Sequence, residues 1–83
     1  MTAKNRVIRT GEELAIRRAS DLYLECLAID ARDEAQSDPV ITGRLFREKL
    51  ASDPGARQAI ADVTATLSVP RRPGYYINRV LKD

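Results

Sequence analysis

Residues 10–35 read TGEELAIRRASDLYLECLAIDARDEA, and this stretch decides the fold. It contains no proline and no glycine after Gly11, and most of its residues are good helix formers. Thr10 and Glu13 have the spacing of a capping box, in which the two side chains bond to backbone amides at the start of a helix. We therefore expect one long helix from about Gly11 to Ala35.

Apolar residues recur along this expected helix at intervals of four, three, four and three. A stripe of that kind normally faces a core, so we expect it to be buried. The single cysteine, Cys26, lies in the stripe, and we expect it to act as a small hydrophobe and not as a nucleophile. Ile16, Tyr23 and Leu27 widen the apolar surface, which hints at a dimer through the first helix, although the rest of the chain could also cover it. The stripe consists of Ala15, Ala19, Leu22, Cys26 and Ile29.

The tripeptide Ser-Asp-Pro occurs twice after the long helix, at residues 37–39 and 52–54. Because an aspartate can cap a helix and a proline fits its first turn, each tripeptide predicts a helix start. We expect helices over about Pro39–Ala51 and Pro54–Leu67. Helical spacing predicts these inward residues: Ile41, Leu45, Phe46 and Leu50 in the first, and Ala56, Ile60, Val63 and Leu67 in the second.

The segment VPRRPGYYINRV, residues 69–80, breaks the helical pattern with its prolines. As a strand it would place Tyr75, Ile77 and Leu81 on one face. The aromatic and β-branched composition favours a strand, but the segment is short and a helix stays open. As a helix, the segment would instead place these residues on one face: Tyr76, Ile77, Val80 and Leu81.

The expected fold is mainly α. Residues 10–83 form a compact three-helix domain with a helix-turn-helix and a short C-terminal β wing or helical turn, and residues 1–9 form a basic arm. A chain of 83 residues has room for one domain with a small core.

The composition argues against several classes of function. The chain has no histidine, a single cysteine and four isolated glycines, so it lacks the commonest general base, an internal disulfide and a glycine-rich phosphate loop. We expect no enzymatic activity, no cofactor and no metal site. Asp30, Asp33 and Glu34 have a helical spacing that could meet a divalent cation, but a solvated acidic face is the more ordinary interpretation. No apolar run approaches the roughly 20 residues that span a bilayer, and we expect a cytoplasmic protein that does not bind membranes.

DNA binding is the sharpest functional hypothesis. The second and third predicted helices with the following basic segment, about Ile41 to Leu81, resemble the winged helix-turn-helix family in layout, which implies DNA binding and transcription regulation. This hypothesis requires exposed arginines, and neutralisation by an acid such as Asp21 or Glu25 would remove its basis. The predicted DNA contacts are Arg57, Gln58, Thr64, Arg71, Arg72, Tyr75 and Tyr76.

The alternative hypothesis is a protein–protein adaptor or inhibitor. It would use the long first helix and the C-terminal segment as its interface. In either case the protein partners could include a second copy, in a homodimer formed through the first helix.

Overall fold

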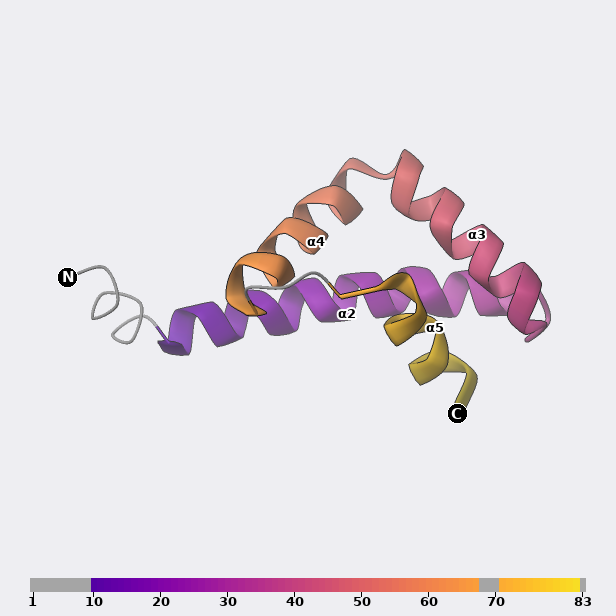
Figure 1. The fold of residues 1–83 in the computed structure, drawn as a ribbon, viewed down its shortest axis with the longest axis horizontal. Coiled ribbons are helices and arrows are strands. Elements are labelled where there is room, and N and C mark those ends of the chain that lie inside the picture. Colours follow the sequence, from indigo (N-terminus) through magenta and orange to yellow (C-terminus); the bar gives the residue numbers. More distant parts are fainter. Residues whose placement is uncertain (1–9, 68–70, 83) are drawn as a thin grey trace.

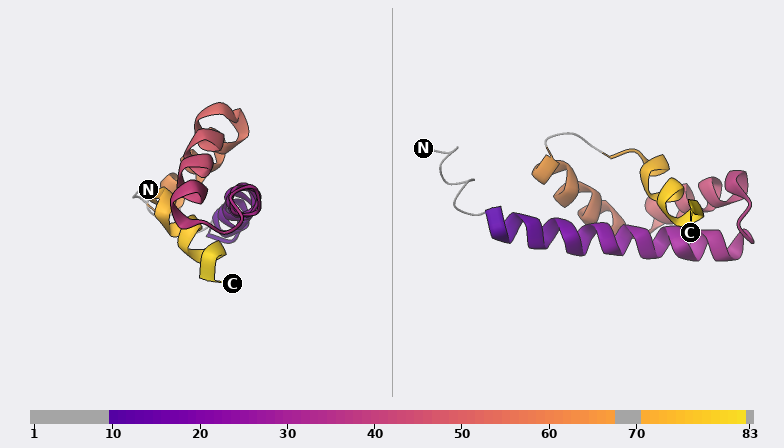
Figure 2. Two further views of the ribbon diagram at one scale, coloured as in Figure 1. Left: turned by 90° about the vertical axis from the view of Figure 1, so that its right-hand side faces the viewer. Right: turned by 90° about the horizontal axis from the view of Figure 1, so that it is seen from below.

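A 25-residue helix, α2 (Thr10–Glu34), runs along one side of the molecule, and three shorter helices pack against it (Figures 1 and 2). They are α3 (Pro39–Ser52), α4 (Pro54–Leu67) and α5 (Pro73–Lys82). The computed structural model describes residues 10–67 and 71–82, and no strand occurs within these ranges. The arm predicted for residues 1–9 and the side chain of Thr10, on which the capping box depends, lie outside this description.

The helix start predicted at the first Ser-Asp-Pro is confirmed. Asp38 caps α3, because its Oδ1 accepts hydrogen bonds from the backbone amides of Val40 (2.9 Å) and Ile41 (3.0 Å). Before this cap the chain reverses through Gln36 and Ser37, whose φ angles of 53° and 66° are left-handed. The reversal lays α3 back along α2.

A single residue, Asp53, separates α3 from α4. Its Oδ1 accepts a 2.8 Å hydrogen bond from the amide of Gly55, and its Oδ2 accepts a 2.6 Å hydrogen bond from the hydroxyl of Tyr23 on α2. The bonds from Tyr23 and Gly55 hold the pKa of Asp53 below its ordinary value, because they stabilise the carboxylate. One side chain therefore bonds into the first turn of α4 and ties the α3–α4 corner to α2.

The predicted β wing is wrong, because residues 73–82 form helix α5. The helical alternative for this segment is confirmed: Tyr76, Ile77 and Val80 are buried on one face of α5, and Leu81 packs beside them. The ring of Tyr76 lies 6.2 Å from that of Phe46 on α3. Burial against α2 and α3 outweighs the strand propensity of the segment, since propensity is a weak preference that packing overrides. The described part of the domain therefore contains four helices where the sequence predicted three.

The core lies between α2 and the three shorter helices. Its largest fully buried apolar side chains are Leu24 of α2, Phe46 of α3 and Val63 of α4. On α3, the predicted inward residue Ile41 is 38% exposed, and Thr42 is buried beside it. None of the described helices combines the length and the apolar character that crossing a membrane requires.

The face of α2 that packs inward is not the predicted one. Leu22 is 61% exposed, Ile29 is 36% exposed and Cys26 is also exposed, so the expectation that this stripe enters the core is wrong. The buried face is built largely from small side chains, which let the shorter helices approach α2 closely. It consists of Ser20, Leu24, Ala28 and Ala31.

Candidate functional site

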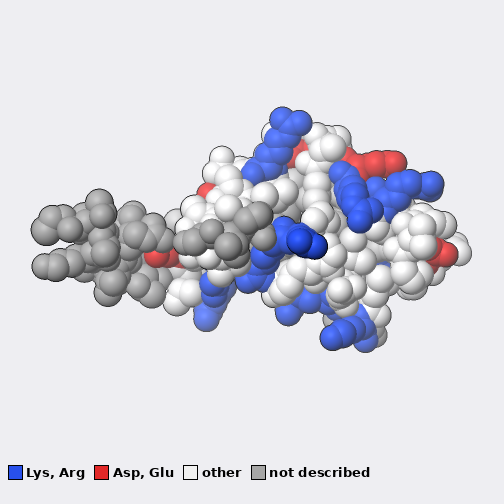
Figure 3. All heavy atoms as spheres, in the orientation of Figure 1, with Lys and Arg blue, Asp and Glu red and all other residues white. Residues whose placement is uncertain are grey.

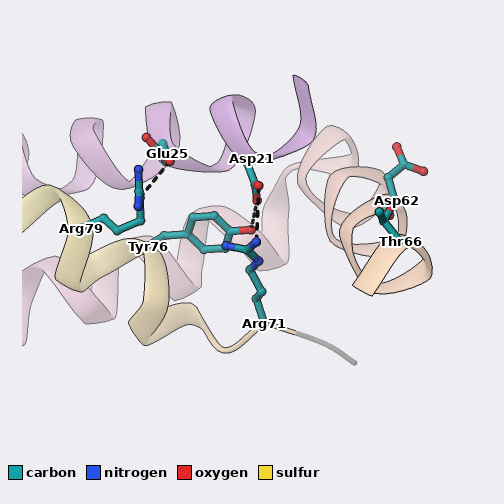
Figure 4. A network of polar contacts seen from close by, with 7 residues as sticks. All are labelled: Asp21, Glu25, Asp62, Thr66, Arg71, Tyr76 and Arg79. Carbon is teal, nitrogen blue, oxygen red and sulfur yellow. Dashed lines mark hydrogen bonds and ion pairs between the residues drawn. The ribbon is translucent and has the colours of Figure 1, made fainter. Parts of the chain in front are cut away.

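Two of the predicted DNA contacts, Arg71 and Tyr76, meet Asp21 of α2 (Figure 4). The Tyr76 hydroxyl donates a 2.7 Å hydrogen bond to Oδ1 of Asp21, and Nη2 of Arg71 lies 3.7 Å from its Oδ2. Tyr76 is buried, and burial together with the Asp21 carboxylate raises the pKa of its hydroxyl well above the ordinary value. Asp21 thus partly neutralises Arg71 and holds Tyr76 inside the protein. The DNA hypothesis requires arginines that no such acid neutralises.

The ring of Tyr75 lies near two guanidinium groups. The Cζ atom of Arg71 is 4.1 Å from the ring centroid, and that of Arg79 is 5.6 Å from it. Arg79 also donates a 3.1 Å hydrogen bond from Nε to Glu25 of α2 (Figure 4). The Arg79–Glu25 bond joins α5 to α2, whereas the two cation–π pairs lie within the C-terminal segment itself.

The predicted contacts on α4 are only partly available to a ligand. Nη2 of Arg57 donates a 3.1 Å hydrogen bond to the carbonyl of Ala51, and Nε2 of Gln58 donates one of 2.9 Å to Asp62. Thr64 is half-buried, whereas Arg57 and Gln58 are exposed. The one-residue connection before α4 is shorter than the three or four residues usual in a DNA-binding helix-turn-helix.

The structure therefore does not bring the predicted DNA contacts together as one free cluster. Arg57, Gln58, Arg72 and Tyr75 are exposed, while Arg71 and Tyr76 are engaged with α2. Figure 3 shows lysine and arginine side chains spread over the visible face, with no single dense basic patch. DNA binding stays a prediction.

A second surface is the side of α2 that faces away from the other helices. With 3.6 residues per turn, the predicted stripe lies opposite Leu24 and Ala28, which face the core. Figure 2 shows α3, α4 and α5 on the other side of α2, so that no described helix covers this side. We call this surface the outer face, and it consists of Ala15, Ala19, Leu22, Cys26 and Ile29.

The outer face is apolar along about four turns of helix and is flanked by Ile16, which is 50% exposed, and by Tyr23. The sequence contained this signal, because the four-three spacing identified the residues. Sequence reasoning placed them in the core, and their exposure became visible only once the shorter helices were positioned.

Two other features offer no comparable site. A pocket of about 290 Å³ between α2 and α5 borders the outer face at Ile29 and is otherwise lined mainly by charged side chains, including Glu25, Arg79 and Lys82. In the acidic segment, Glu34 accepts a 2.7 Å hydrogen bond from Lys49, and no group of three potential metal ligands occurs in the part of the chain that the structure describes.

A scan against protein-family models, a search of curated proteins and a search of solved structures each found no match to this chain. The functional argument therefore depends on the geometry of the outer face and of the exposed cations.

Proposed function

We propose that this protein is a non-enzymatic interaction module that docks another protein surface on the outer face of α2. The observation that carries the proposal is the exposure of Leu22 and Ile29 on an apolar stripe directly opposite the core. A scattered exposed leucine needs no explanation, but a contiguous apolar surface on a small protein is typical of an interaction site.

Within the described residues, the outer face contributes little to the core, although Ile29 at its C-terminal end lines the pocket beside α5. The core side of α2 is provided by other residues, such as Leu24 and Ala28, so a polar residue at Leu22, which is 61% exposed, would not disturb it. Burying apolar surface contributes roughly 25 cal/mol per Å², and the side chains of the outer face gain this only when a partner covers them. This supports association as their function.

Cys26 provides a built-in test, because its thiol lies in the outer face and the chain has no other cysteine. Cells that express the full chain are treated briefly with N-ethylmaleimide, and alkylation of Cys26 is followed by mass spectrometry. The matched variant is Leu22→Glu, expressed in the same cells, because a buried charge would prevent docking. Both proteins are also labelled after purification and dilution, which gives their intrinsic rates.

Relative to those intrinsic rates, Cys26 of the native chain is expected to react several-fold more slowly in cells than Cys26 of the Leu22→Glu variant. A covered thiol is shielded from the reagent, whereas an exposed one is not. Equal relative rates for the two proteins would contradict the proposal.

DNA binding is the second candidate function, and the exposed side chains of Arg57 and Arg72 favour it. Its test is a gel shift over a salt series, since binding to phosphates weakens steeply as salt rises. A shift at low salt that Arg57→Ala and Arg72→Ala reduce would support it. No shift at low salt would refute it.

A further inference from the structure

We infer that the occupant of the outer face is a second copy of this chain, whose α2 lies antiparallel to the first. The inference rests on the proposed function of the outer face and names its partner. Its three supports are the spacing of the stripe, the match of side-chain sizes across it and the distribution of charge along α2.

The spacing is that of a coiled-coil seam. The steps of four and three between Ala15 and Ile29 average 3.5 residues, the repeat at which two helices wind around each other. The next step of four reaches Asp33, which lies at the C-terminal end of the same seam. A second helix fits this narrow stripe better than a broad globular surface does.

An antiparallel arrangement gives a match of sizes. With its twofold axis near residue 24, Leu22 of one copy lies opposite Cys26 of the other, and Ala19 lies opposite Ile29. Each layer then pairs a larger side chain with a smaller one, as close packing between helices requires. Because the arrangement is symmetric, every such pair occurs twice.

Charge selects the antiparallel direction. Asp33 of one copy lies opposite Ala15 of the other, and Arg18 lies one turn from that alanine. No hydrogen bond or ion pair occupies Arg18 within the described chain. The side chain of Asp33 pairs at 3.4 Å with the adjacent Arg32 but is 67% exposed, so it can accept a second cation. In a parallel dimer Asp33 would instead lie against the second copy's identical carboxylate, which is repulsive.

The fold permits this arrangement. The shorter helices all lie on one side of α2, so two outer faces can meet without displacing them (Figure 2). The contact is short, from about Ala15 to Asp33, which corresponds to roughly 27 Å of helix. We therefore expect a reversible dimer that dissociates on dilution.

Sedimentation equilibrium of the purified full chain between about 1 µM and about 1 mM tests the inference, because a weak dimer changes its population over this range. The native chain is expected to change from monomer to dimer, and Leu22→Glu is expected to stay monomeric. Val40→Glu is the matched control, because Val40 is 81% exposed on α3 and lies off the seam. It is expected to dimerise as the native chain does, and circular dichroism checks that each variant is folded.

Two further variants test the direction. R18E and D33R are each expected to weaken the dimer about tenfold, and the double variant is expected to restore it, because opposite charges face each other again. L22C should form an oxidised covalent dimer readily with Cys26 of the second copy, whereas a parallel dimer would link Cys26 to Cys26 in the native chain.

The outcomes separate the inference from the proposed function. If the chain stays monomeric at all concentrations but Cys26 is protected in cells, the inference that the partner is a second copy is overturned. The proposal that the outer face docks a different protein would then remain. A monomer with Cys26 unprotected in cells would overturn both. A native chain that cross-links through Cys26, with no rescue by the double charge reversal, would overturn the antiparallel arrangement.

Discussion

The hydroxyl of Tyr76 on α5 donates a 2.7 Å hydrogen bond to the carboxylate of Asp21 on α2, across 55 positions of sequence. This bond joins the last helix to the first, and Arg71 approaches the same carboxylate from the segment before α5. Arg71 and Tyr76 thus have a structural task, which leads to the first predictions.

Tyr76→Phe is expected to lower the free energy of unfolding by about 1–2 kcal/mol. The substitution keeps the buried ring but removes a hydrogen bond to a charged acceptor. Urea denaturation measures the effect. Tyr75→Phe is the control and should change stability less, because Tyr75 is 40% exposed. Equal effects of the two substitutions would show that the bond to Asp21 adds nothing to the free energy of unfolding.

Alkaline pH should weaken the fold partly through Tyr76. Burial, and then the Asp21 bond, raise the pKa of Tyr76 in the folded protein above its ordinary value of 10.0. The protonated hydroxyl is therefore favoured by folding, so its contribution is complete below pH 10.0 and is lost as the pH rises above it. Between about pH 8 and about pH 11, the midpoint of urea denaturation should fall by more for the native chain than for Tyr76→Phe. Parallel losses would contradict the prediction.

Arg71→Ala and Arg72→Ala should differ although the two residues are neighbours. Arg71 is paired with Asp21 and stacked on Tyr75, so its loss is expected to cost about 1–2 kcal/mol of stability. Arg72 is exposed, and its replacement should change stability by less than about 0.5 kcal/mol. Thermal denaturation compares them. Equal stabilities of the two variants would show that the contacts of Arg71 with Asp21 and Tyr75 do not stabilise the fold.

Gly55→Ala should destabilise the α3–α4 corner by about 1–2 kcal/mol. A Cβ at Gly55 would collide with the Tyr23 hydroxyl oxygen and would lie 2.8 Å from Cζ of the same ring, so the Tyr23–Asp53 bond would have to shift. Gly11→Ala is the control, because nothing lies within 4 Å of its added Cβ, and it should be neutral or stabilising.

A Tyr23→Ala background shows whether the collision is the cause. There, Gly55→Ala should no longer destabilise, because alanine favours a helix more than glycine does and the ring is gone. Chemical denaturation of the four proteins completes the cycle. A cost of Gly55→Ala that is unchanged without the tyrosine ring would point to another cause.

The ends of α3 and α4 could be predicted because local chemistry sets them. Asp38 and Asp53 supply side-chain oxygens to free backbone amides, and the prolines that follow fit the first helical position. These interactions lie within three residues of chain and need no tertiary contact. Asp21, in contrast, could not be assigned as the partner of Arg71 and Tyr76, because that contact depends on how α5 meets α2.

By itself the sequence determined three helices, their order and their limits to within one residue, through helix formers and caps. Only the tertiary structure decided that the C-terminal segment is a fourth helix and that α2 turns Leu24 and Ala28 inward while Leu22 and Ile29 face outward. The physical reason is that both faces of α2 carry apolar residues at helical spacing, so periodicity cannot choose between them. The choice depends on long-range contacts, because apolar side chains of the shorter helices, such as Phe46 and Val63, pack against the face that carries Leu24 and Ala28.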